Sequence, residues 1–205
     1  MGRWEDRALP RLVELTCGGK EMEKFRGRTV EGLSGSIVEL GFGSGLNAPV
    51  YPAEVTTVAA VEPSMLARER SARHTTTTTA TIDFVGLDGA RLPLEDASCD
   101  GALCTFTLCT IPDVTAALAE LHRVVRPGGR FHFLEHGRAP DESVRTWQRR
   151  IEPIQRRVAG GCHLTRDPEV LVSDAGFEIV EIERRYVKGP KPFAYFTLGK
   201  AIRPA

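Results

Sequence analysis

Three glycines stand at every second position in the stretch VELGFGSGLNAPVYP, residues 38 to 52, immediately after an apolar run. Gly41, Gly43 and Gly45 lack side chains, so a ligand can approach their backbone closely, and a following helix N-terminus offers unpaired N–H groups. The spacing is G-x-G-x-G, whereas dinucleotide folds use G-x-G-x-x-G to cradle a pyrophosphate. With Glu39 just ahead of the glycines, this pattern favours a nucleotide-type cofactor without phosphates.

Further polar groups follow at the ends of the next two apolar runs. Glu62 ends the second run, and a carboxylate there can accept both hydroxyls of a ribose. Asp88 and Gly89 follow the third run and suit the reading of an adenine through an acceptor and a backbone N–H. Because parallel strands bind ligands outside their carboxyl ends, we expect these groups to line one crevice with the glycine loop.

Apolar runs of strand length alternate with segments of helical period, which is typical of a parallel sheet covered by helices on both faces. The expected parallel strands are residues 36–41, 55–62, 81–87, 100–108 and 130–136. Apolar residues at three- and four-residue spacing predict a helix between the last two strands, and Ser64 is the expected N-cap of another. Residues 177–187 and 193–202 read as two strands of a closing hairpin.

Between this core and the hairpin, apolar residues from Val144 to Val158 share one helical face, although Pro153 should kink or interrupt the helix. We expect the region 137–176 to form a lid over the substrate side of the crevice, with GGCHLTRDP as a loop. The whole chain then reads as one domain, with residues 1–35 as an N-terminal helical cap, 36–136 as the cofactor-binding core and 177–205 as the closing hairpin.

The composition indicates which partners and which cellular compartment to expect. The 205 residues suffice for one core, and 27 Lys and Arg balance 27 Asp and Glu, so no polyanionic partner such as nucleic acid is expected. Five cysteines without a CxxC pair suit a reducing, cytoplasmic setting and predict no metal site. The charged N-terminus and the lack of a long apolar run predict no integral membrane segment. Peripheral membrane contact and the oligomeric state stay open.

Four motifs in order, VELGFGSG, VEPSML, LDGARLPLEDASCDGALCTFTLC and LHRVVRPGGRFHFLEH, resemble the series of class I S-adenosylmethionine-dependent methyltransferases. CTFTLC, FLEH and GGCHLTRD together resemble the methyltransferase-like group that includes thiol S-methyltransferases, with quinone-biosynthesis and phospholipid N-methyltransferases as more distant likenesses. The resemblance implies an α/β fold with a doubly wound, Rossmann-like sheet of seven strands, mostly parallel with an antiparallel C-terminal strand. It also implies S-adenosylmethionine as donor, S-adenosylhomocysteine as product and a small-molecule acceptor.

The resemblance also implies roles for single residues. Donor-binding roles fall on Glu39, Gly41, Gly43 and Gly45 around the methionine and ribose, Glu62 at the ribose, Pro63 and Met65 as an adenine wall, and Asp88 and Gly89 at the adenine. Thr105 and Phe106, at the end of the fourth strand, would lie beside the sulfonium and the incoming nucleophile.

A thiol is the favoured acceptor, ahead of an amine, a phenol, a quinone-type carbon or a phospholipid head group. A thiol is only a few per cent ionised at neutral pH, so a nearby basic group would help. His136 is the first candidate, and His163 and Cys162 come next. The alternative role for His136 is a hydrogen bond to backbone, and for Cys162 it is that of a small apolar core residue. A nicotinamide oxidoreductase and a non-catalytic donor-binding module are the alternative classes.

Overall fold

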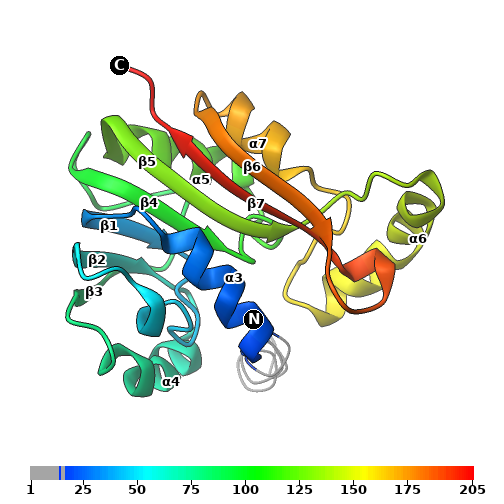
Figure 1. Cartoon of the computed structure of the whole chain (residues 1–205), viewed down its shortest axis with the longest axis horizontal. Helices are drawn as coiled ribbons and strands as arrows, with labels where there is room; N and C mark the ends of the chain where they lie inside the picture. Colours follow the sequence, from blue (N-terminus) through cyan, green and yellow to red (C-terminus); the bar gives the residue numbers. More distant parts are fainter. Residues whose placement is uncertain (1–13, 15–16) are drawn as a thin grey trace.

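A seven-stranded sheet forms the centre of the protein (Figure 1). The computed structural model describes Glu14 and residues 17–205, so most of the first half of the expected N-terminal cap lies outside the described residues. The strands are β1 (Gly35–Leu40), β2 (Val55–Val61), β3 (Thr81–Gly86), β4 (Cys99–Thr105), β5 (Val125–His136), β6 (Glu178–Tyr186) and β7 (Tyr195–Ile202). They lie in the order β3-β2-β1-β4-β5-β7-β6.

The pairing confirms the expected fold class. Strands β1 to β5 pair in parallel, and β7 lies antiparallel between β5 and β6. The two C-terminal strands form the expected hairpin, joined through the short helix η2 (Lys191–Phe193). Since β6 pairs antiparallel with β7, it runs in the same direction as β1 to β5, and β7 alone runs the other way.

Helices cover both faces of the sheet, as Figure 1 shows. The described helices are α3 (Lys20–Val30), α4 (Met65–Thr75), α5 (Val114–Val124), α6 (Glu142–Val158), α7 (Pro168–Asp174) and the short η1 (Ala48–Val50). In β1, Val38 and Leu40 pack with α5 in one core cluster, whereas Ile37 packs with Val30 of α3 in another. This alternation places α5 and α3 on opposite faces, because successive strand side chains point in opposite directions.

The structure confirms one predicted helix boundary and corrects two other expectations from the sequence. Ser64 is the N-cap of α4, since its Oγ accepts a hydrogen bond from Ala67 N at 3.2 Å, as predicted. Pro153 does not interrupt α6, which continues to Val158. The region 162–174 contains the short helix α7 after the GGCHLTRDP loop, and the sequence reading missed it. No described helix is long and apolar enough to cross a membrane.

The order of the strands creates the position of a ligand site. β2 and β3 lie on one side of β1, whereas β4 and β5 lie on the other, so the connections diverge between β1 and β4. A crevice forms at such a switch point, outside the carboxyl ends of the strands. The glycine loop follows β1 at this edge.

A buried imidazole fastens α3 to the sheet and gives a prediction about acid stability. His132 of β5 is 1% exposed, and its Nδ1 donates to the backbone oxygen of Thr29 at 2.7 Å. Burial lowers the pKa of His132 from 6.5 to about 4, so the folded protein disfavours protonation that the unfolded chain accepts. The stability that this contributes is complete above the unfolded pKa and is lost as the pH falls from 6.5 towards 4, by on the order of 3 kcal/mol.

The replacement His132→Asn should therefore flatten the acid side of the stability profile. Denaturant unfolding of both proteins between roughly pH 7 and pH 4.5 measures the effect, because the carboxylates and the other histidines are the same in the two chains. Parallel loss of unfolding free energy in the variant and the parent over this range would contradict the assignment.

Candidate active site

A pocket of about 1000 Å³ lies at the carboxyl ends of β1, β2, β3 and β4. Its wall contains residues from each strand end: Gly41–Ser44 after β1, Glu62–Ser64 after β2, Leu87–Arg91 after β3, and Thr105–Thr107 after β4. Residues Thr110–Asp113, Ala116, Ala159 and Gly160 continue the wall, and Arg26 and Cys17 also contribute to it. The structure thus brings together at one edge most of the positions predicted from the strand ends.

The three glycines have different surroundings. Gly41 and Gly43 line the pocket with φ of +68° and +58°, a conformation that glycine adopts without strain. A Cβ on Gly41 would lie 2.1 Å from the Thr107 hydroxyl oxygen, so the loop requires glycine there. Gly45 is not among the lining residues, and a Cβ there would press on Ser71 of α4 at 3.2 Å. The third glycine therefore serves the packing of loop against helix.

Glu62 joins the glycine loop to the end of β2 while facing the pocket. Its Oε2 accepts from Gly43 N at 2.8 Å and its Oε1 accepts from Ser64 N at 2.7 Å. Glu62 is only 7% exposed. This burial raises the pKa of its carboxyl group, although the two N–H donors act in the opposite direction. Each carboxylate oxygen has two lone pairs, so one acceptor position per oxygen remains for a ligand hydroxyl.

The predicted adenine wall is only partly assembled. Pro63, Asp88 and Gly89 line the pocket, and the Asp88 carboxylate accepts from Ala90 N at 2.9 Å. Met65 does not line it: the residue is 70% exposed at the start of α4. The family resemblance implied this role for Met65, but the helical turn beginning after Ser64 directs this position to solvent.

A buried polar network forms another part of the wall and includes a residue that the sequence reading missed. Arg26 of α3 donates from Nη1 to Asn47 Oδ1 and to Thr105 Oγ1, each at 2.7 Å. Its Nε is buried and has no hydrogen-bond acceptor among the described residues. Burial lowers the pKa of Arg26, yet a guanidinium remains charged in proteins. Because Arg26 also lines the pocket, its positive charge suits an anionic group such as a carboxylate.

Glu39, predicted to contact the donor, belongs to the same network instead of the pocket surface. It is fully buried and accepts hydrogen bonds from Asn47 Nδ2 at 2.7 Å and from the Tyr51 hydroxyl. Burial raises the pKa of Glu39 to about 7, although these donors oppose the rise. Its contact with the pocket is indirect, through Asn47 and Thr105.

The backbone turns sharply at the end of β4, where Thr105 and Phe106, the residues expected beside the sulfonium, line the pocket. Phe106 has a φ of +53°, which is uncommon outside glycine and marks local strain. The following loop is held by Glu135, whose Oε1 accepts from Thr107 N at 2.7 Å and from Leu108 N at 2.9 Å. Glu135 is fully buried, and burial raises its pKa. The strand end FLEH was recognised, but this use of its glutamate was not.

The predicted bases lie outside the pocket lining. His136 Nε2 is 3.0 Å from Cys162 Sγ, and His163 Nδ1 is 3.3 Å from Glu152 Oε1. Hydrogen bonds from Cys109 and His136 lower the pKa of the Cys162 thiol to about 4. Neither histidine belongs to the pocket wall, so the structure does not bring either of them to the position that a general base would occupy.

Comparison with known proteins agrees with this architecture. The family described as "Methyltransferase domain" matches residues 38–133. The rat thiol S-methyltransferase TMT1B is 31% identical over 178 residues, covering 82% of this chain and 68% of that protein. The human TMT1B is 30% identical over 189 residues, covering 84% of this chain and 72% of that protein. The ubiquinone/menaquinone biosynthesis C-methyltransferase UbiE of Rubrivivax gelatinosus is 37% identical over 101 residues, covering 48% of this chain and 38% of that protein.

Solved structures share the fold. A methyltransferase structure from Bacillus halodurans superimposes with a TM-score of 0.71 at 13% identity, covering 91% of this chain and all of that one. A Haemonchus contortus N-methyltransferase bound to phosphomonomethylethanolamine and S-adenosylhomocysteine gives 0.69 at 14% identity, covering 98% of this chain and 60% of that one. The chain belongs to the class I S-adenosylmethionine-dependent methyltransferases, in the group that includes the thiol S-methyltransferases. Its cofactor is S-adenosylmethionine.

The carboxylate of Glu135 gives a prediction about the loop after β4. Glu135→Ala should lower the free energy of unfolding by about 2 kcal/mol or more, because it leaves the N–H groups of Thr107, Leu108 and Cys109 without their acceptor. Glu135→Gln is the matched control, since the Gln oxygen can still accept the bonds from Thr107 and Leu108. Denaturant unfolding compares the three proteins, and equal losses in Ala and Gln variants would show that the acceptor oxygen is not what stabilises the loop.

Proposed function

We propose that this methyltransferase methylates a small-molecule thiol, with the donor held at the strand ends and the acceptor between the β4 loop and the segment after α6. The observation that carries the proposal is the single pocket that joins these two regions in the described part of the chain. Its volume of about 1000 Å³ reaches the upper end of the usual range for ligand pockets and suits a donor together with a small acceptor.

The wall residues suggest how the donor is held. Glu62 would accept the ribose hydroxyls with its remaining lone pairs, and Asp88 with the Gly89 backbone would read the adenine. The Arg26 guanidinium, which lines the pocket, would attract the methionine carboxylate by its positive charge. Gly41 and Gly43 would let the chain approach the donor closely.

The acceptor end has apolar and hydroxyl-bearing walls. Phe106, Thr107, Thr110, Ile111 and Pro112 line it together with Ala159 and Gly160. A neutral, largely apolar acceptor fits these aromatic, aliphatic and hydroxyl side chains. The nearby cation, the Arg26 guanidinium over the Phe106 ring, already donates to Asn47 and Thr105. The similarity to proteins named thiol S-methyltransferases supports a thiol among such acceptors.

When bound, the donor supplies a methyl group attached to a sulfonium sulfur. That sulfur is a good leaving group, because it departs as a neutral thioether. The protein then contributes chiefly alignment and exclusion of water. Since His136 and His163 do not line the pocket, we propose that the thiol reacts as the thiolate already present in solution equilibrium, without a histidine base. Thr105 and Phe106 would position the nucleophile beside the methyl group.

The direct test measures transfer of a labelled methyl group to an alkyl thiol, an aryl thiol, a phenol, an amine and phosphatidylethanolamine. Saturable transfer to a thiol is expected, with a rate that rises about tenfold per pH unit below the acceptor's own pKa. The rise should therefore end at a lower pH for the aryl thiol, which is the stronger acid. NADH oxidation is the control for an oxidoreductase.

Transfer to the amine or phospholipid with none to either thiol would contradict the proposed acceptor. One shared pH midpoint for the two thiols would instead assign the ionisation to the enzyme and restore a general base to the mechanism.

Glu62→Gln should weaken binding of S-adenosylhomocysteine about 10- to 100-fold, because the side chain keeps its shape but loses one acceptor and its charge. The matched control is Glu69→Gln on the exposed surface of α4, which should bind as the parent does. Isothermal calorimetry measures both affinities. Unchanged binding by Glu62→Gln would remove Glu62 from the donor site.

A further inference from the structure

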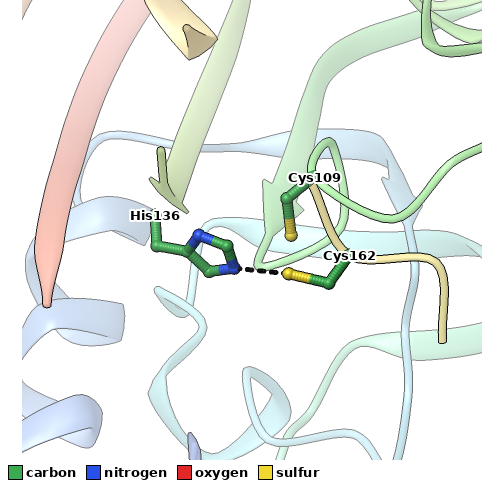
Figure 2. Close-up of side chains that lie close together, drawn as sticks. All are labelled: Cys109, His136 and Cys162. Atoms are coloured by element: carbon green, nitrogen blue, oxygen red, sulfur yellow. Dashed lines mark hydrogen bonds between the residues drawn. The ribbon is translucent and has the colours of Figure 1, made fainter. Parts of the chain in front are cut away.

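Three potential metal ligands converge from segments that are distant in the sequence. Cys109 lies in the loop after β4, His136 is the last residue of β5, and Cys162 lies in the loop after α6. Figure 2 shows the two sulfur atoms and the imidazole ring directed towards one another. The three ligand atoms all lie within 4.8 Å of one another, and Cys162 Sγ is 3.0 Å from His136 Nε2.

The geometry points to a zinc site, and we propose that Cys109, His136 and Cys162 bind one Zn²⁺ ion. Two thiolates and an imidazole are a usual ligand set for zinc, with Zn–S distances of about 2.3 Å and Zn–N distances of about 2.0–2.1 Å. Such bonds place neighbouring ligand atoms about 3.5–3.8 Å apart in a tetrahedron. The observed cluster reaches that spacing through shifts of about an ångström or less. Three protein ligands leave a fourth position for water.

The surroundings favour a bound cation over three unrelated side chains. Cys109 and Cys162 are 3% and 4% exposed, and two thiolates would neutralise the charge of a buried Zn²⁺ ion. The Gln155 amide lies 3.7 Å from Cys162 Sγ, as a donor to a ligating thiolate would. The backbone of Cys109 is fixed on both sides, because its N–H donates to Glu135 at 3.4 Å and its carbonyl accepts from His163 N at 2.8 Å.

The ion would brace the pocket without entering it. Thr110 directly follows Cys109, and Gly160 precedes Cys162 by one intervening residue; both Thr110 and Gly160 line the pocket, whereas the three ligands do not. Zinc would therefore tie the loop after β4 to the loop after α6 and set the width of the wall between them. The expectation that this chain has no metal site came from the lack of a CxxC pair, a signal that cannot detect ligands from three separate segments.

The test uses the purified full chain, freed of metal under reducing conditions. Addition of Zn²⁺ should raise the melting temperature, and Co²⁺ should produce tetrahedral d–d bands with a sulfur-to-cobalt charge-transfer band in the near ultraviolet. Competition with a chromophoric chelator should give one ion per chain. Cys109→Ser, His136→Gln and Cys162→Ser should each weaken zinc binding at least 10- to 100-fold, the loss that a supporting contact alone can cause.

Cys99→Ser is the matched control, because Cys99 is equally buried in β4 but lies outside the cluster, and it should bind zinc as the parent does. Absence of the sulfur-to-cobalt band in the parent protein would overturn the proposal even if the ligand variants fail to fold. An equal loss of zinc in Cys99→Ser, or binding of Cu⁺ with none of Zn²⁺, would overturn it as well.

Discussion

The buried hydrogen-bond network around Asn47 is the interaction on which the pocket depends. Asn47 connects the carboxylate of Glu39, near the end of β1, to the guanidinium of Arg26 on α3. The hydroxyl of Thr105, at the end of β4, accepts hydrogen bonds from both the Arg26 guanidinium and the Asn47 amide. Burial of two opposite charges is costly unless each is hydrogen-bonded, so these side chains fix one another. Through them, the glycine loop, the helix over the sheet and the strand beside the acceptor take a single relative position.

Glu135 holds the loop after β4 in place by hydrogen bonds, as the network around Asn47 holds the glycine loop. Its carboxylate collects N–H groups that a tight turn would otherwise leave unpaired in the core. Two of the acidic residues near the pocket, Glu39 and Glu135, thus hold backbone and side chains in place, and Glu62 both holds Gly43 and faces the ligand. Acidic character at a strand end therefore does not by itself separate a ligand contact from a structural bond.

The sequence predicted the sheet and the donor half of the pocket because both follow from local patterns. The end of a strand can be read from the sequence, and parallel pairing brings such ends to one edge of the sheet. For this reason Glu62, Asp88 and Thr105 were expected at one crevice, and all three line the pocket. Arg26 could not be found in this way, since its partner Thr105 is 79 residues away and no motif surrounds it. The short helix α7 did carry a signal, an Asp167-Pro168 start, but its seven residues give too little periodicity to detect.

Two parts of the pocket wall are held in different ways. The ladder of the sheet fixes the wall residues at the strand ends, whereas another part of the wall consists of two loops that bond to each other, as in the contacts from Arg166 to the carbonyls of Leu108 and Ile111 at 2.6 and 2.8 Å. The region 137–176, expected to form a lid, contributes Ala159 and Gly160 to the pocket wall, whereas Trp147 and Ile154 of α6 are 56% and 64% exposed. Substitutions in these loops can therefore reshape that part of the wall while the sheet and the strand-end residues stay unchanged. If the proposed function holds, such substitutions would alter the preference for the acceptor without a change of donor.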